Sequence, residues 1–206
     1  MGREDEKAMA AYQAHRRLIL ALVIGSVCLL LVFGGSLQDD LTHELIESHG
    51  LALILIGIGG RLWSILYIGG RKSEEVVASG PYSIMRNPLY FFSTIAAIGV
   101  GAQTGSYVIT FALTLLCMIA FHIVTLREER YLKANLGAPY ISYLQRVPRF
   151  FPNPRLFRDE AAVTFTPRVF RTTFLDGLVF LLAVPFFEII EIGQETGFIT
   201  VLFRVP

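Results

Sequence analysis

Two polar segments carry the side chains that are best suited to chemistry. The first, residues 79–90, reads Ser-Gly-Pro-Tyr-Ser-Ile-Met-Arg-Asn-Pro-Leu-Tyr. Its Gly-Pro pair predicts a sharp turn, and the Asn-Pro pair predicts a second break at which Pro88 opens a helix. The two turns enclose an arginine, an amide and two tyrosines. An ordinary interfacial connector, with tyrosines at the membrane surface and an arginine facing lipid phosphate, explains this composition equally well.

The second segment begins with Thr-Leu-Arg-Glu-Glu-Arg-Tyr-Leu at residues 125–132. Glu128 and Glu129 are adjacent carboxylates at the predicted end of an apolar helix. The negative end of the helix dipole disfavours them there, unless the helix continues or a cation compensates. Arg127 and Arg130 can compensate, so a solvated charge cluster is one interpretation. The other is that one carboxylate points inward to meet a bound cation.

Hydrophobic spans must position these segments, because 53% of the 206 residues are hydrophobic and the mean hydropathy is +0.55. These values predict an integral membrane protein. The apolar stretch 88–126 is too long for one crossing, at about 1.5 Å per residue against a bilayer core of about 30 Å. It must form a tight hairpin, which turns at the glycines and polar groups of residues 101–106. We expect an all-α fold of about five transmembrane helices, at residues 18–37, 50–70, 88–100, 106–126 and 172–192.

The fifth span contains a proline and three acids, and the tail that follows it, residues 193–206, is too short to cross again. We expect the tail to lie at the membrane interface or to pack on the bundle. The chain is interpreted as a single domain over residues 1–206. Cys28 and Cys117 both lie within apolar runs and behave as small hydrophobic residues. A disulfide or a metal site is therefore not predicted. We also expect no nucleic-acid partner.

The basic residues predict the orientation in the membrane. Sixteen of the 18 Lys and Arg residues precede the first span or lie in the links after the second and fourth spans. None lies in the link after the first span or in the hairpin turn. By the positive-inside rule, the amino terminus faces the cytoplasm and the carboxyl terminus lies outside. We expect the inner (cytoplasmic) membrane of a bacterium or archaeon, with function on the cytoplasmic side.

Taken together, the two polar segments resemble a known family. The first motif is followed about 40 residues later by Glu-Glu-x-Tyr-Leu-x-x-x-x-Gly-x-x-Tyr-x-x-Tyr-x-x-x-Val-Pro-Arg-Phe-x-Pro. In order and spacing, this pair is similar to the motifs of the isoprenylcysteine carboxyl methyltransferase and phospholipid methyltransferase superfamily. The resemblance covers about residues 71–152, with cofactor motifs at 76–90 and 127–152. The remaining helices match only in being helices.

The resemblance implies S-adenosylmethionine as the cofactor, with S-adenosylhomocysteine as its product. The sulfonium and the α-ammonium of this cofactor are cationic, so a carboxylate and tyrosine faces are suitable partners. Many family members have histidine at the position of Asn87. Because asparagine cannot titrate, this departure argues against a general base at that position. The positions that match the family's cofactor site are Val76, Val77, Tyr82, Asn87, Pro88, Leu89, Tyr90 and Glu128.

The resemblance further implies methyl transfer to a membrane-embedded lipid or lipid-like acceptor. Carboxyl O-methylation of an isoprenylcysteine-like, prenylated substrate is the leading interpretation, and N-methylation of an ethanolamine phospholipid is the alternative. A catalytically silent scaffold or lipid-binding protein is the rival from another class. Because in-line displacement requires alignment and exclusion of water, an arginine that holds the acceptor would help.

The candidates for the catalytic roles are two arginines and a carboxylate. Arg86 is predicted to orient the acceptor and Arg149 to bind a headgroup or carboxylate. Glu129 is predicted to help an amine acceptor lose its proton. Arg61 lies inside a predicted span, where it is either functional or snorkels to the membrane surface.

Overall fold

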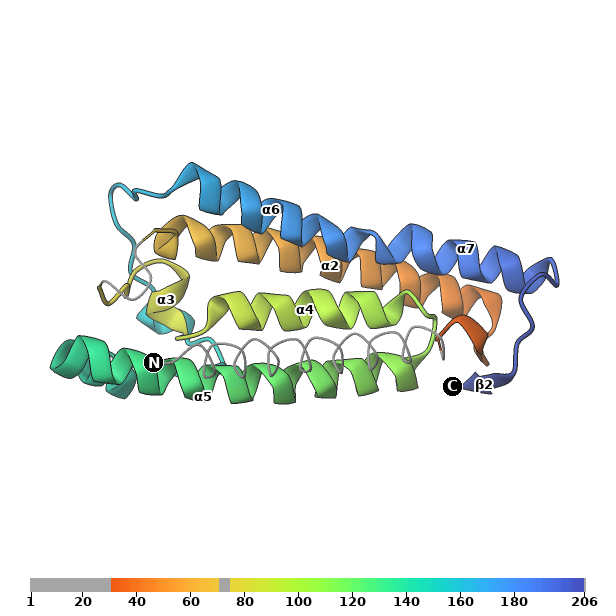
Figure 1. The fold of residues 1–206 in the computed structure, drawn as a ribbon, viewed down its shortest axis with the longest axis horizontal. Helices are drawn as coiled ribbons and strands as arrows, with labels where there is room; N and C mark the ends of the chain where they lie inside the picture. The colour runs from red at the N-terminus through yellow and green to blue at the C-terminus, as the bar shows by residue number, and fades with distance from the viewer. Residues whose placement is uncertain (1–30, 71–74, 206) are drawn as a thin grey trace, which may run out of the picture.

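The computed structural model describes residues 31–70 and 75–205 of the chain and is mainly helical (Figure 1). Its elements, in chain order, are β1 (Gly34–Ser36), α2 (Asp40–Ile68), α3 (Pro81–Ile84), α4 (Pro88–Ala102), α5 (Tyr107–Arg146), the 3-10 helix η1 (Pro154–Leu156), α6 (Pro167–Leu181), α7 (Ala183–Glu195) and β2 (Phe203–Val205). The long helices run roughly parallel to one axis. α4 lies between α2 and α5, and α6 and α7 follow the opposite side of α2 (Figure 1).

The expected all-α membrane fold is confirmed. Three helical segments of the described chain are long and apolar enough to cross a membrane, Asp40–Ile68, Tyr107–Arg146 and Pro167–Glu195. Pro88–Ala102 is a shorter apolar helix, and it forms the expected hairpin with α5. The span predicted at 18–37 lies largely outside the described residues. Within its described part, the helix gives way to β1 at Gly34, earlier than predicted.

Several helices extend beyond the apolar runs that predicted them. α2 begins ten residues before the predicted span, because Asp39 caps it by accepting hydrogen bonds from the Thr42 backbone at 3.3 Å and from its hydroxyl at 2.7 Å. α5 continues to Arg146, past the predicted end at 126, so the paired glutamates lie within a helix. The last span is broken at Leu182, where Pro185 has no N–H to offer the final carbonyl of α6.

Small residues allow α2 and α4 to pack closely. A Cβ added at Gly57 would lie 2.6 Å from the Cβ of Ala96, and one added at Gly99 would lie 2.4 Å from the carbonyl oxygen of Gly50. Without side chains at these positions, the two backbones approach closely, and the resulting van der Waals packing holds membrane helices together. The α2–α4 pair is therefore a fixed frame for the groups at either end of the bundle.

The tail packs on the bundle through a feature that the sequence did not predict. β2 pairs in parallel with β1, with Gly34 opposite Phe203. This two-stranded sheet and the α4–α5 turn lie at one end of the bundle, and α3 lies at the other (Figure 1). Which end faces the cytoplasm stays a prediction from the charges, as does the single-domain interpretation of residues 1–206.

Candidate functional site

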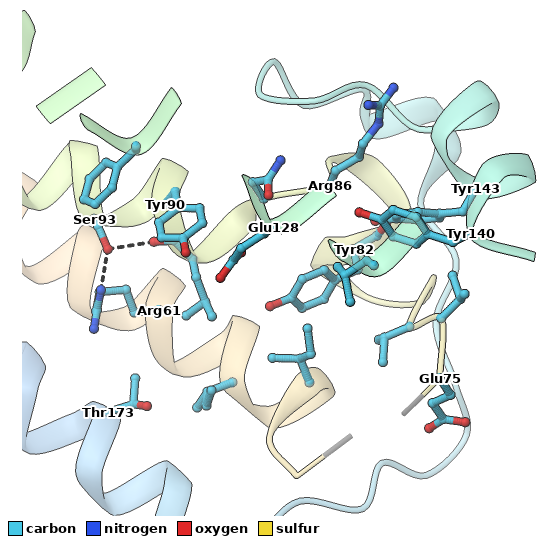
Figure 2. A pocket seen from close by; sticks show the side chains of 18 of the residues that line it. Arg61, Glu75, Tyr82, Arg86, Tyr90, Ser93, Glu128, Tyr140, Tyr143 and Thr173 are labelled. Atoms are coloured by element: carbon cyan, nitrogen blue, oxygen red, sulfur yellow. Dashed lines mark hydrogen bonds between the residues drawn. The ribbon is translucent and has the colours of Figure 1, made fainter. Parts of the chain in front are cut away.

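A cavity of about 330 Å³ opens at the α3 end of the bundle. Its walls come from α2, the segment before α3, the start of α4, both parts of α5, and α6. Both polar segments singled out in the sequence contribute to it, although some 40 residues of hairpin separate them. The lining is mainly apolar and contains a few polar groups that converge on one space (Figure 2), as is typical of small-molecule sites.

Tyr82 forms one wall from the short helix α3. The chain enters α3 through Gly80, at φ 54°, and Pro81 occupies the first helical turn. The hydroxyl of Tyr143 donates a hydrogen bond to the carbonyl of Tyr82 at 2.9 Å and fixes the position of this turn. The Tyr82 hydroxyl is buried and has no hydrogen-bond partner among the described residues. Burial raises the pKa of Tyr82 well above its ordinary value, so the phenol stays a neutral donor.

Glu128 enters the cavity from α5, opposite Tyr82. Figure 2 shows Glu128, Tyr82 and Tyr90 pointing toward one another across the cavity. The hydroxyl of Tyr90 lies within hydrogen-bonding reach of the Glu128 carboxylate. The Tyr90 ring stacks on Phe121 with its centroid 5.1 Å away, which holds the two arms of the hairpin together beside the cavity. A carboxylate between two tyrosines is a suitable environment for a small cation.

Glu129, the neighbour of Glu128, points away from the cavity and is bound by two arginines. Arg149 donates to its two carboxylate oxygens at 3.0 and 2.7 Å, and Arg86 donates to one of them at 3.2 Å. Hydrogen bonding to Glu129 raises the pKa of Arg149, so the pair stays charged. Arg86 also donates to the carbonyls of Val147 at 2.6 Å and Leu144 at 2.5 Å. The cluster ties the segment after α5 to both polar motifs.

Arg61 reaches the cavity from within α2. It donates a hydrogen bond to Ser93 of α4, and its guanidinium lies 5.7 Å from the centroid of the Phe180 ring of α6. Its Nε is buried without a hydrogen-bond partner among the described residues. The side chain therefore lines a cavity between three helices, rather than extending along α2 to the membrane surface, which favours the functional interpretation of this intramembrane arginine.

The structure brings together most of the predicted cofactor residues. Those that line the cavity are Val76, Val77, Tyr82, Asn87, Leu89, Tyr90 and Glu128. Pro88 begins α4 and is buried, but is not among the lining residues. Of the predicted catalytic residues, Arg86 lines the cavity, whereas Glu129 and Arg149 do not. The roles assigned to all these residues stay predictions.

Some lining residues were missed by the sequence reasoning. Tyr140 and Tyr143 line the cavity because Gly137, at φ 61°, breaks α5 and redirects the residues that follow it. The Gly-x-x-Tyr-x-x-Tyr spacing within the second motif was the signal for them. Thr173 and Phe180 line the cavity from α6, and no motif marked them.

The lining can accommodate a ligand that is both cationic and amphipathic. Glu128 supplies a carboxylate, the Tyr82 hydroxyl supplies a free donor, and aliphatic side chains of α2 and α5 surround them. These groups fit S-adenosylmethionine, whose own sulfonium and ammonium groups are cationic and whose own carboxylate can accept a hydrogen bond. Arg61 adds a fixed positive charge at the membrane side of the same cavity. An anionic acceptor can therefore approach from that side.

Comparison with known proteins gives two kinds of relative. The family model for phospholipid methyltransferases matches residues 46–138. The chain is 33% identical over 184 residues to the cobalt-zinc-cadmium resistance protein CzcN of Cupriavidus metallidurans, covering 89% of this chain and 85% of the relative. It is 31% identical to the nickel-cobalt-cadmium resistance protein NccN of Alcaligenes xylosoxydans xylosoxydans, covering 93% and 90%. Protein-S-isoprenylcysteine O-methyltransferase B of Arabidopsis thaliana is 28% identical over 120 residues, 53% of this chain and 61% of the relative. No solved structure gives a significant match.

Proposed function

This chain belongs to the superfamily of integral membrane methyltransferases that includes the isoprenylcysteine carboxyl and phospholipid methyltransferases, and we propose that it transfers a methyl group from S-adenosylmethionine to a lipid-like acceptor in the membrane. The observation that carries this proposal is that Glu128 and Tyr82 line the same cavity, and that the buried Tyr82 hydroxyl has no hydrogen-bond partner among the described residues. The cofactor, when bound, supplies an electrophilic methyl group on its sulfonium. Glu128 offers a negative charge to its cationic groups, and Tyr82 offers a donor to its carboxylate.

The acceptor is proposed to enter from the side of Arg61. An anionic group on the acceptor can pair with the guanidinium, while Phe180 of α6 and the apolar lining contact its hydrocarbon chain. A carboxylate acceptor needs no general base, and an arginine would hold it in line with the methyl group. Carboxyl O-methylation of an isoprenylcysteine-like compound is therefore proposed first. N-methylation of an ethanolamine phospholipid is the second candidate, which the match to the phospholipid methyltransferase family model favours.

Arg86, Glu129 and Arg149 are proposed to position the site rather than to touch the reacting atoms. Every nitrogen of the Arg86 guanidinium donates a hydrogen bond within the protein. Both Glu129 oxygens accept from Arg149, so this carboxylate is not available to receive a proton from an amine. Because the cluster joins the end of α5 to the first motif, it holds Asn87 and Tyr82 in place.

The relatives named for metal resistance suggest a setting for this reaction. Methylation of a carboxylate removes its negative charge and with it an oxygen ligand for metal cations. We propose that the enzyme lowers the metal-binding capacity of a membrane component in cells exposed to such metals. A strain that lacks the enzyme should then be more sensitive to Zn²⁺, Co²⁺ or Ni²⁺, and the variant Glu128→Gln should fail to restore growth. Full restoration by this variant would contradict the link between methyl transfer and resistance.

Calorimetric titration of S-adenosylhomocysteine into the detergent-purified protein tests the cofactor site. We expect saturable binding that Glu128→Gln weakens strongly and that Glu44→Gln, a carboxylate change on exposed α2 surface at the other end of the bundle, leaves unchanged. Incubation with methyl-labelled cofactor and a lipid extract, followed by mild base, then separates the two acceptor classes, since methyl esters release the label and methylamines retain it. Failure of well-folded wild-type protein to bind the cofactor would overturn the proposal.

A further inference from the structure

Three side chains of metal-binding type meet at the end of the bundle opposite the cavity. His43 and Glu47 lie one turn apart on α2, and Glu191 comes from α7, which runs beside α2 (Figure 1). His43 Nε2 lies 3.3 Å from Glu47 Oε1 and 3.5 Å from Glu191 Oε1. One ligand atom from each residue lies within 4.8 Å of the other two. Within residues 31–70 and 75–205, this is the one group of three or more His, Cys, Asp or Glu side chains that comes so close.

The separations agree with those between ligands of a single ion. Zn²⁺ binds imidazole nitrogen and carboxylate oxygen at about 2.0–2.2 Å in tetrahedral geometry, so two ligands of one ion lie about 3.4 Å apart. Both contacts of His43 Nε2 are within a few tenths of an ångström of this value. Rotation of the Glu191 side chain, which is 43% exposed, can adjust the third separation, between the carboxylate oxygens of Glu47 and Glu191. Three protein ligands would leave a fourth position open.

The surroundings favour a cation. Two adjoining cavities of about 250 and 630 Å³ meet at the cluster. The carboxylates that line them, besides Glu47 and Glu191, are Asp40, Glu44, Glu188 and Glu195. Arg204 is the one Lys or Arg residue among the lining residues of the two cavities. A concave surface with such an excess of negative charge attracts cations, and a bound divalent ion would offset the repulsion between Glu47 and Glu191.

The His43 ring is held in place by the hairpin turn. Gly105 has φ 61°, and a Cβ at this position would lie 2.3 Å from Cε1 of the His43 ring. The absence of a side chain at Gly105 therefore makes room for the imidazole. Gln103, in the same turn, donates a hydrogen bond to the backbone carbonyl of Glu47 at 2.8 Å. These contacts hold in place the part of α2 that carries His43 and Glu47, as a preorganised site requires.

We propose that His43, Glu47 and Glu191 bind one divalent transition-metal ion of the Zn²⁺ class. Imidazole with two carboxylates is a ligand set that such ions accept. The ion would clip α7 to α2.

Zinc titration of the full chain in detergent tests the site, with a purification tag that contains no histidine and a chromophoric chelator as competitor. We expect one equivalent of Zn²⁺ to bind saturably and to raise the midpoint of thermal unfolding. His43→Gln and Glu191→Gln should each weaken binding at least about tenfold, since even loss of a supporting group near a metal costs that much. His49→Ala is the matched control, because this exposed histidine lies on α2 outside the cluster and should leave binding unchanged.

Two results would overturn the proposal. One is that wild-type protein shows no saturable binding of one equivalent. The other is that His43→Gln and Glu191→Gln bind Zn²⁺ as tightly as His49→Ala does, in which case His43 serves as a protonated bridge between two carboxylates. Glu191→Gln keeps the size of a partly exposed side chain, and size-exclusion profiles and unfolding without Zn²⁺ verify that each variant is folded.

Discussion

The two ends of the bundle form their sites in different ways. At the α3 end, the cavity is lined largely by residues from two short motifs, each continuous in the sequence. The order and spacing of those motifs already indicated a shared site. At the opposite end, the acidic cluster (His43, Glu47 and Glu191) forms where Glu191 of α7 meets two residues of α2 that lie far from it in the sequence. A site with local sequence signals is therefore open to sequence reasoning, whereas a site made by helix packing becomes visible only in the structure.

The largest expected effect separates the two ends directly. Glu128→Gln should weaken S-adenosylhomocysteine binding by about a hundredfold, because a charge-assisted contact contributes roughly 1.5–3 kcal/mol. It should leave zinc binding unchanged. Glu191→Gln should show the reverse pattern. Calorimetric titration of both variants with both ligands checks this, and a loss of both affinities in either variant would mean that the ends are not independent.

A second prediction concerns the frame that both ends share. Gly57→Ala places a methyl group 2.6 Å from the Cβ of Ala96, so we expect a loss of about 1–3 kcal/mol of stability from overpacking between α2 and α4. Gly59→Ala is the matched control on the same helix, because a Cβ there meets nothing within 4 Å. It should be neutral or stabilising by up to about 1 kcal/mol. Thermal unfolding of both variants in detergent measures the difference, and equal midpoints would contradict the observed packing.

A third prediction separates the adjacent glutamates. Glu129→Gln should lower stability by about 1.5 kcal/mol, since it leaves two arginine side chains without their carboxylate partner. The figure is kept at the lower end because Arg149 is 36% exposed and its ion pair is screened by solvent. Glu128→Gln, one residue away, should change cofactor affinity and not the unfolding midpoint. A Glu129→Gln variant with wild-type stability and no activity would instead support the predicted role of Glu129 in proton transfer.

The sequence predicted much of the fold for a physical reason. Hydrophobic runs measured against bilayer thickness indicate helices, and the long run 88–126 required a hairpin, which α4 and α5 form. Helix ends were less predictable, because caps such as Asp39 and breaks such as Gly137 depend on single residues. The pairing of β1 with β2 joins two strands of three residues, too short to give an alternating pattern.

The same reasoning explains which site residues were found. Seven of the eight predicted cofactor residues line the cavity because they lie in two short motifs at the ends of the hairpin arms. Residue types and spacing left open which of the two adjacent carboxylates points inward, and only the family resemblance assigned Glu128 to the cofactor. In the structure, Glu128 lines the cavity and Glu129 binds Arg149. Phe180 could not be found either, because its side chain enters the cavity only through the packing of α6 on α2.

The smallest expected effect concerns Arg61, which belongs to α2 of the frame and also lines the cavity. Arg61→Met should raise the KM for an anionic acceptor by about tenfold, a loss of about 1.4 kcal/mol of binding, since methionine keeps the apolar stem and removes the charge. Arg61→Lys should fall between the two, because lysine keeps the charge without the planar fork that reaches Ser93 and Phe180. Affinity for S-adenosylhomocysteine should be the same in all three proteins. If Arg61→Met lowers the unfolding midpoint and leaves the acceptor KM unchanged, Arg61 clips α2 to α4 and α6 and takes no part in acceptor binding. The KM and the midpoint together therefore decide whether the cavity has a separate acceptor side, as its lining indicates.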